Sequence, residues 1–182
     1  MSDYQLIRHC APTLARIKTG SLIACPGEDK KSVVAFTREM NLRLRGKGLR
    51  LMPFRVRRGH FLLYVYRPEA LSRDLMDGDA RAILEPLGYP CRDMSACLRR
   101  LGARLVACDE FPHEIGLFLG YPPEDVYGFI YRRGEEKYCG SWMVYGDVDA
   151  ARRTFARYKK CAALYMRLWA QGHSIEQLTV AV

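Results

Sequence analysis

The sequence predicts an α+β fold, in which a small antiparallel sheet of about three strands is covered by seven to nine helices. Residues 49–66 alternate apolar and polar positions around a glycine, as a β-hairpin does, and residues 137–145 resemble a third strand. Most of the remaining chain has helical periodicity between proline and glycine boundaries. No repeat or linker divides the 182 residues, so we expect a single domain over 1–182.

Two helices are predicted before the hairpin, at 11–18 and 32–45. Pro12 lies in the first turn of the first helix, where a backbone N–H is not needed. Ser32 is a suitable cap for the second helix. Thr19-Gly20-Ser21 is predicted to end the first helix, and a loop at 25–29 precedes the second.

The hairpin strands are predicted at 49–57 and 60–66. A two-residue loop at 58–59 would pair Val56 with Phe61 and Phe54 with Leu63, and these four side chains would face the core. The opposite face would carry Arg55, Arg57, His60, Leu62, Tyr64 and Tyr66.

Arginines among tyrosines are typical of surfaces that stack bases and bind phosphate. We therefore take Arg55, Arg57 and Tyr64 as candidate ligand-binding residues. The alternative is that helices cover this face, with the arginine stems lying along it.

The C-terminal two thirds of the chain is predicted to be mainly helical. Asp147 and Ser174 are suitable N-caps for its last two helices, and the longer of these has one apolar stripe. The predicted helices cover 68–76, 79–87, 93–102, 112–119, 123–131 and 148–171, followed by a turn that Ser174 opens.

Positive charge is concentrated in the N-terminal third. Residues 1–66 hold 13 Lys and Arg against 4 Asp and Glu, whereas residues 67–182 hold 16 of each. Eight of the basic residues lie between Arg38 and Arg58, where Glu39 is the one acidic residue. This segment could attract a nucleic acid or another anionic ligand, and the alternative is a solvated surface without a partner.

Composition also indicates the compartment. The seven cysteines are odd in number and form no Cys-x-x-Cys pair, which favours a reduced cytoplasmic protein without a zinc ribbon. No apolar run approaches the roughly 18 residues of a membrane span, and the first residues do not resemble a signal peptide. We therefore expect no membrane partner, and the sequence identifies neither a metal site nor a cofactor.

Cys10 and His113 are the candidate catalytic residues, because each would lie at the start of a predicted helix. The helix dipole there would stabilise a thiolate at Cys10 and a neutral imidazole at His113. If they meet, Cys10 could act as nucleophile and His113 as base, with Glu114 among the residues that could orient the base. The alternatives are a buried thiol and a structural histidine. His9 is a further candidate ligand-binding residue, because a His-Cys pair can contribute to a metal or haem site.

Four segments together resemble a known family: His-Cys-Ala-Pro-Thr-Leu-Ala at 9–15, Phe-Pro-His-Glu-Ile-Gly-Leu-Phe-Leu-Gly-Tyr-Pro at 111–122, Trp-Met-Val-Tyr-Gly-Asp at 142–147 and Ser-Ile-Glu-Gln-Leu-Thr at 174–179. The family is an uncharacterised bacterial one, catalogued as a domain of unknown function, the 3793 family. The resemblance spans nearly the whole chain and implies a single-domain bacterial cytoplasmic protein. It supplies no activity, cofactor or catalytic residue. Glycine is usual in this family where the chain has Arg16.

Two classes of function follow. The first is a cytoplasmic binding or regulatory domain with a pocket near His113 and a basic N-terminal third. The second is a thiol hydrolase or transferase that uses Cys10 and His113. The first is slightly preferred, on the general frequency of the two classes alone.

Overall fold

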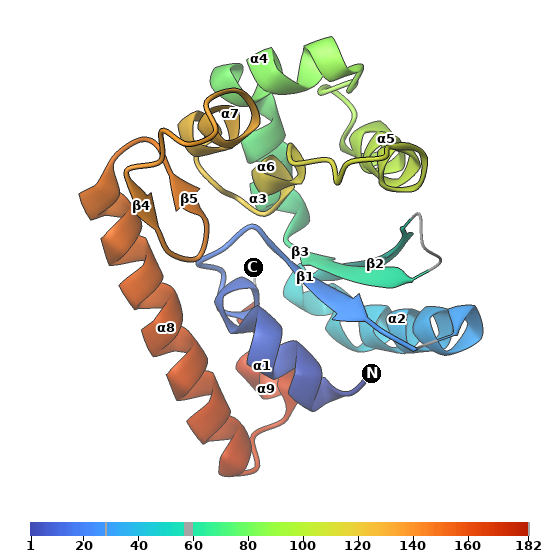
Figure 1. Ribbon diagram of the computed structural model, residues 1–182. Coiled ribbons are helices and arrows are strands. Elements are labelled where there is room, and N and C mark those ends of the chain that lie inside the picture. The colour runs from blue at the N-terminus through green and yellow to red at the C-terminus, as the bar shows by residue number, and fades with distance from the viewer. Residues whose placement is uncertain (28, 57–59, 182) are drawn as a thin grey trace.

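A three-stranded antiparallel sheet lies between two groups of helices (Figure 1). The computed structural model describes residues 1–27, 29–56 and 60–181. The sheet is formed by β1 (Gly20–Cys25), β2 (Arg50–Arg55) and β3 (Phe61–Tyr66), with β3 in the centre. A separate two-stranded ribbon pairs β4 (Tyr138–Cys139) with β5 (Met143–Val144).

The predicted α+β class is confirmed, and the described part of the chain contains nine α-helices. They are α1 (Asp3–Leu14), α2 (Lys30–Leu44), α3 (Pro68–Met76), α4 (Gly78–Leu84), α5 (Met94–Ala107), α6 (Ile115–Phe118), α7 (Pro123–Tyr131), α8 (Val148–Ala170) and α9 (Ile175–Leu178). Short 3-10 turns follow α2 at Arg45–Lys47 and α4 at Glu85–Leu87. Among these helices, none is long and apolar enough to cross a bilayer.

Each face of the sheet is covered by its own apolar cluster. Along β3, Leu62, Tyr64 and Tyr66 join the cluster formed with α3 to α7. The alternate residues Phe61, Leu63 and Val65 join the cluster formed with α1, α2, α8 and α9. Side chains of a strand point alternately to its two faces, so a central strand that is apolar throughout requires helices on both sides.

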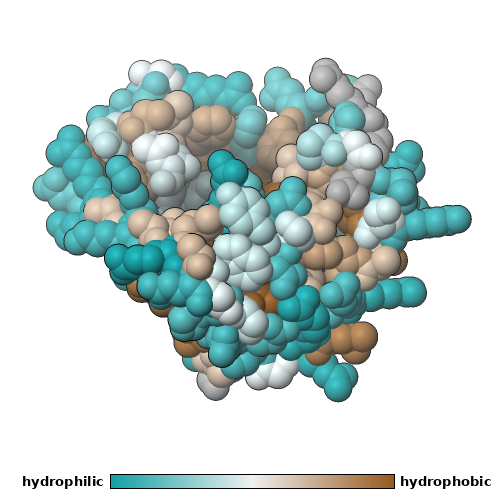
Figure 2. Space-filling model, turned by 90° about the horizontal axis from the view of Figure 1, so that it is seen from below, coloured by the Kyte–Doolittle hydropathy of each residue, from teal (hydrophilic) through white to brown (hydrophobic). Residues whose placement is uncertain are grey.

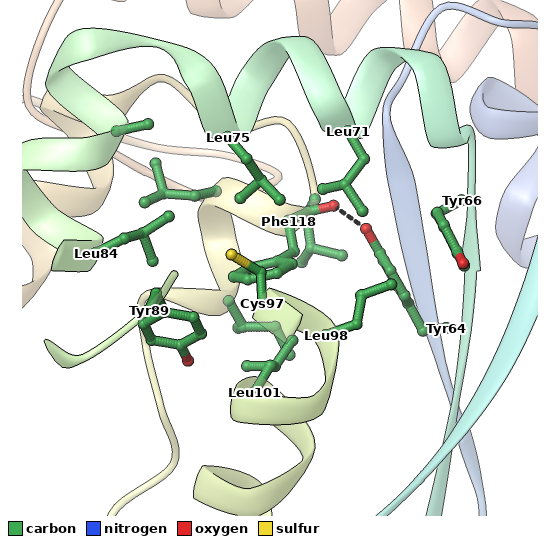
Figure 3. Packing of buried hydrophobic residues seen from close by; sticks show 14 of the residues in the cluster. Tyr64, Tyr66, Leu71, Leu75, Leu84, Tyr89, Cys97, Leu98, Leu101 and Phe118 are labelled. Carbon is green, nitrogen blue, oxygen red and sulfur yellow. Dashed lines mark hydrogen bonds between the residues drawn. The ribbon is translucent and has the colours of Figure 1, made fainter. Parts of the chain in front are cut away.

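Tyr64 lies on the sheet side of the first cluster, beside Tyr66 (Figure 3). Its side chain is fully buried, and its hydroxyl donates a hydrogen bond to the carbonyl of Phe118 in α6. The Tyr64 ring stacks on that of Tyr66, with the ring centroids 4.8 Å apart. A buried tyrosine needs a partner for its hydroxyl, and here that partner fixes α6 against the sheet.

The hairpin is confirmed, but its predicted register is wrong by one residue. Phe54 pairs with Leu62 and Arg55 with Phe61, and the N–H of Val56 donates to the carbonyl of His60. Val56 and His60, the last hydrogen-bonded pair, are therefore separated by three residues of the chain, whereas the predicted loop has two. The predicted turn at 58–59 lies outside the described residues. Because a shift of one residue exchanges the two faces of a strand, Phe54 lies on the same face as Tyr64.

The third strand of the sheet is β1, and the prediction that 137–145 supplies it is wrong. Sequence reading treats Thr19-Gly20-Ser21 as a helix end, but Gly20 pairs with Tyr66. A Cβ on Gly20 would lie 2.6 Å from a ring carbon of Tyr64 and 2.8 Å from the Phe118 carbonyl oxygen. Glycine is therefore required here for close packing, and it does not mark a turn.

The first helix also differs from its prediction. It starts at Asp3, where Ser2 and Gln5 form a capping box, and Pro12 lies near its C-terminal end. The second helix is capped by Asp29 instead of Ser32. The predicted ranges of α3 and α7 match the structure, and that of α8 differs by one residue at its end.

Arg67, between β3 and α3, joins three segments. Its guanidinium donates hydrogen bonds to the carbonyls of Thr13 and Leu14, in the last turn of α1, and to the carbonyl of Lys47. The residue is 4% exposed, and no carboxylate is among its hydrogen-bond partners in the described residues. A cation at the C-terminal end of a helix is favoured by the helix dipole, which accounts for its position beside α1.

We predict that Arg67→Lys lowers the free energy of unfolding by about 2–4 kcal/mol, since the compact ammonium of lysine does not reproduce the planar fork of donors that reaches three separate carbonyls, and charged hydrogen bonds contribute about 1.5–3 kcal/mol each. Urea unfolding measures the change. The matched control is Arg100→Lys, because exposed Arg100 bonds one carbonyl, that of Leu87. Equal stability losses in the two variants would contradict this role of Arg67.

Candidate ligand-binding site

Of the candidate ligand-binding residues of the hairpin, Arg55 and Tyr64 are described, and they do not share a surface. Tyr64 is completely buried and presents no surface to a ligand. Arg55 is exposed at the end of β2, and Arg57 lies outside the described residues. His9 is exposed on α1. The prediction that Tyr64 binds a ligand is therefore wrong. Helices cover the face of the sheet that carries Tyr64 and Tyr66, and both rings are part of the core.

Cys10 does not have the environment on which its catalytic role was predicted. It lies inside α1 near the C-terminal half, so the dipole of a helix N-terminus does not act on its thiol. Its side chain is fully buried among apolar residues, and burial raises the pKa of the thiol to about 12. Nearby Lys18 and a hydrogen bond from Ser21 oppose this rise without overcoming it. The thiolate needed by a nucleophile is therefore strongly disfavoured.

His113 and Glu114 face different surroundings. Glu114 is 3% exposed, and its Oε1 accepts hydrogen bonds from the Tyr89 hydroxyl, at 2.9 Å, and from Nε of Arg104. This arrangement makes Glu114 part of a buried ion pair between α5 and the residues before α6. The carboxylate is therefore occupied and does not orient His113.

His113 lies on the surface side of the same turn. Its ring contacts the rings of Phe111 and Phe129, with centroids 6.2 Å and 4.8 Å away. Burial lowers the pKa of His113, and the positive charge of Arg133 lowers it further. The predicted neutral imidazole thus has a different cause: α6 begins only at Ile115, beyond His113.

Part of the basic segment Arg38–Arg58 is already paired. Arg43 is neutralised by three carboxylates, those of Asp3, Glu39 and Glu176. Arg38, Arg45 and Arg50 line one open hollow, and Arg50 also lines a second cavity, which is described next. Hydrophilic side chains predominate on the face shown in Figure 2, with apolar ones between them.

Six cationic side chains line a cavity of about 710 Å³, which we call the basic cleft. It lies between the α1–β1 connection, the start of α3 and the middle of α8, which are far apart in the sequence (Figure 1). Glu69 is its one acidic lining residue among those the structure describes. Its cationic lining residues are Arg16, Lys18, Arg50, Arg67, Arg73 and Arg157.

Lys18 is the most deeply placed amine of the basic cleft. Its Nζ lies 5.3 Å from the centroid of the Tyr121 ring and 5.9 Å from that of Tyr158. Burial lowers the pKa of Lys18 to about 8, and the nearby Cys10 opposes this. Contacts with aromatic faces offset part of the cost of burying the charge, but within the described residues no carboxylate pairs with this amine.

The N-terminus of α3 opens into the same cavity. Pro68, Glu69 and Ala70, in its first turn, line the basic cleft, and no side chain caps this end of the helix. The Glu69 carboxylate is largely exposed and lies 3.7 Å from Arg16. Free N–H groups at a helix N-terminus attract anions, and here they add to the charge of the surrounding guanidinium groups.

An apolar pocket of about 340 Å³ adjoins the basic cleft. It is lined by rings of the 111–130 segment and by the β4–β5 ribbon, and it contains the His113 side chain. Trp142 lines both hollows, and its Nε1 donates to Asp125 at 2.7 Å. A pocket beside His113 is thus present, although Cys139, rather than Cys10, is the cysteine that lines it.

Sequence reading missed the cations that line the basic cleft outside 38–58: Arg16, Lys18, Arg67, Arg73 and Arg157. They come from three separate places in the chain, at 16–18, 67–73 and 157, and no short motif contains more than two of them. Arg67 before Pro68 was the one local signal, since an arginine at a helix start is electrostatically unusual. Only the packing of α3 and α8 around the end of α1 brings these residues together.

A family model described as "Protein of unknown function (DUF3793)" matches residues 6–179. The chain belongs to the DUF3793 family. No curated protein and no solved structure matches it. The match contains every residue that lines the basic cleft. In this DUF3793 chain Arg16 has a φ of 60°, which explains why glycine suits the position just after the first helix.

We predict that Cys10 resists alkylation in the native protein while exposed Cys139 reacts readily, because a buried thiol with a raised pKa has almost no thiolate. Peptide mass spectrometry after treatment with a maleimide measures both rates. Cys97 is the internal control, since it is equally buried and burial also raises its pKa to about 12. Modification of Cys10 at neutral pH well ahead of Cys97 would restore the thiol-enzyme hypothesis.

Proposed function

We propose that this protein is a binding module for a small anionic ligand, an organic phosphate, which it holds in the basic cleft. The observation that carries the proposal is that six cationic side chains surround a cavity with one carboxylate in its described lining. Like charges gathered in a cavity repel one another, and an anion in the cavity removes that repulsion. The cleft volume of about 710 Å³ is within the range of small-molecule sites, which is roughly 300–1,000 Å³.

The surroundings of Lys18 support an anionic ligand in particular. A half-buried ammonium without a counter-ion is disfavoured, as the lowered pKa of Lys18 reflects. A phosphate near Nζ would provide the missing negative charge and would raise this pKa again. The uncapped first turn of α3 offers backbone N–H groups to the same anion.

A small ligand is favoured over a nucleic acid because the cations lie inside a cavity. Arg43, one of the basic residues of the predicted polyanion segment, already binds three carboxylates. Phosphates of an extended nucleic acid would need cations along an open surface. For the thiol-enzyme alternative, no observation in the described residues brings Cys10 and His113 together, and that pairing stays a prediction.

The proposal also includes the compartment and the organisation of the protein. An organic phosphate is a ligand of the cell interior, in keeping with the seven cysteines of the sequence and with a cytoplasmic protein. One domain is sufficient, since α1, α3 and α8 all contribute to the basic cleft. The module would sense or carry its ligand without transforming it.

We predict that pyrophosphate binds the protein and that Lys18→Met and Arg157→Gln each weaken binding about 10-fold or more, because a charged contact contributes about 1.5–3 kcal/mol. Isothermal titration calorimetry at constant, low ionic strength measures the dissociation constants. Lys18→Met retains most of the apolar stem of the side chain, which limits any effect on folding.

The matched control is Arg153→Gln, which removes an exposed arginine of α8 outside the basic cleft. It should change the dissociation constant less than about 2-fold, since exposed charges at a distance are screened by salt. Equal effects of Arg153→Gln and Arg157→Gln would show a diffuse attraction and would contradict a defined site. Absence of binding to the unsubstituted protein would overturn the proposal.

Anion binding should also depend on pH. The free protein holds Lys18 charged below its pKa of about 8, so affinity is highest there and falls as the pH rises through this value. Tyr121, Tyr158 and Cys10 face Lys18, and burial raises the pKa of each, so they stay neutral in this range.

Sulfate is the probe for this measurement, because its charge does not change between pH 7 and pH 9. Calorimetric affinities measured across that interval should fall for the unsubstituted protein and stay level for Lys18→Met. A level profile for both proteins would indicate that Lys18 does not contact the anion.

A further inference from the structure

The basic cleft and the apolar pocket share a wall. In the turn after α6, Gly120 and Pro122 line the basic cleft, whereas Leu119 and Tyr121 line the apolar pocket. Trp142, in the loop between β4 and β5, lines both. Successive residues of one turn thus belong alternately to two hollows, which places the hollows directly side by side.

The turn requires glycine at position 120. Gly120 has a φ of 76°, in the left-handed region, and a Cβ there would lie 2.8 Å from Oγ1 of Thr19. Thr19 belongs to the connection that also carries Lys18 into the basic cleft. The wall is therefore held close to the cationic residues.

An aromatic stack connects the two hollows. The Lys18 amine lies over the ring of Tyr121, and that ring stacks on Trp142 with centroids 4.6 Å apart and an interplanar angle of 25°. Phe155 meets Trp142 edge-on at 4.5 Å. Asp125 fixes the indole by accepting its N–H, while its other oxygen accepts two backbone N–H groups. Trp142 is thus held in a defined position between the two sites.

The apolar pocket is suited to a planar ring. Its walls include five rings, and its volume of about 340 Å³ lies at the lower end of the range for small-molecule pockets, roughly 300–1,000 Å³. These rings belong to Phe111, His113, Tyr121, Phe129 and Trp142.

Few polar groups line this pocket. The neutral His113 imidazole can donate one hydrogen bond and accept another, and the Ser141 hydroxyl can do the same. Aromatic walls with a small number of polar groups are typical of sites for heteroaromatic rings.

We infer that the ligand of the basic cleft is an organic phosphate that carries a planar heteroaromatic ring, with its phosphate among the cleft cations and its ring in the apolar pocket beside Trp142. This inference rests on the proposed function and adds the chemical class of the ligand to it. Such a ligand contacts Trp142 along its length, because this side chain lines both hollows.

The test compares two probes that share a sugar phosphate and differ in the ring: adenosine 5′-monophosphate and ribose 5-phosphate. The sequence contains two tryptophans, so Trp169→Phe leaves Trp142 as the one tryptophan reporter. Adenosine 5′-monophosphate should bind at least about 10-fold more tightly than ribose 5-phosphate, since stacking of a base contributes about 1–3 kcal/mol. It should also change Trp142 fluorescence strongly, whereas ribose 5-phosphate should change it little.

Two further variants separate the two parts of the site. Phe129→Leu removes a ring of the pocket while keeping an apolar side chain, so it should weaken adenosine 5′-monophosphate and leave ribose 5-phosphate unchanged. Arg157→Gln should weaken both probes by the same factor. These outcomes would show that one ligand occupies both hollows.

Three results would contradict the inference in distinguishable ways. Equal affinity for the two probes, without a fluorescence difference, would contradict binding of a ring in the apolar pocket and would leave the anion-binding proposal intact. Adenosine binding as tightly as its monophosphate would show a ring pocket independent of the cleft. Failure of adenosine 5′-monophosphate, ribose 5-phosphate and pyrophosphate alike to bind would overturn the proposed function itself.

Discussion

The guanidinium of Arg67 is the interaction on which the arrangement of this molecule most depends. It closes the C-terminal end of α1, holds the 3-10 turn after α2, and lies at the point where β3 becomes α3. Its charge is balanced by carbonyl dipoles and by the end of a helix, since the described residues place no carboxylate against it. One consequence is structural, because three segments are joined. The other is electrostatic, because the positive charge of Arg67 lines the basic cleft.

The central strand imposes a second constraint. Since β3 is apolar on both faces, helices must cover both, and segments from both groups of helices meet at the end of the sheet where β1 and β2 begin and β3 ends. The basic cleft is formed at that meeting place, between the α1–β1 connection, α3 and α8. Surface charge there is therefore not a property of one basic segment. The cations are brought together because the two apolar clusters pack on opposite faces of the same strand.

The catalytic hypothesis failed to gain support for a specific reason. Cys10 seemed to precede a helix because Pro12 suits a first turn, but the capping box of Ser2 and Gln5 starts α1 earlier. The same proline then lies near the end of the helix, and Cys10 falls on its buried face. His113 retains a pocket, yet its neighbour Glu114 is occupied by Arg104 and Tyr89. An error of eight residues in the start of the first helix thus reversed the electrostatic argument for Cys10.

The sequence by itself determined the α+β class, the hairpin, the ranges of α3 and α7, and nearly the range of α8. These features depend on caps, breakers and periodicity among residues that are close in the chain. Tertiary structure alone decided the register, the addition of β1 to the sheet, the burial of Tyr64 and the gathering of cations around Lys18. Each of these depends on contacts between distant segments: Gly20 pairs in β1 because it leaves room for Tyr64, and Arg157 reaches the basic cleft because α8 packs on α1.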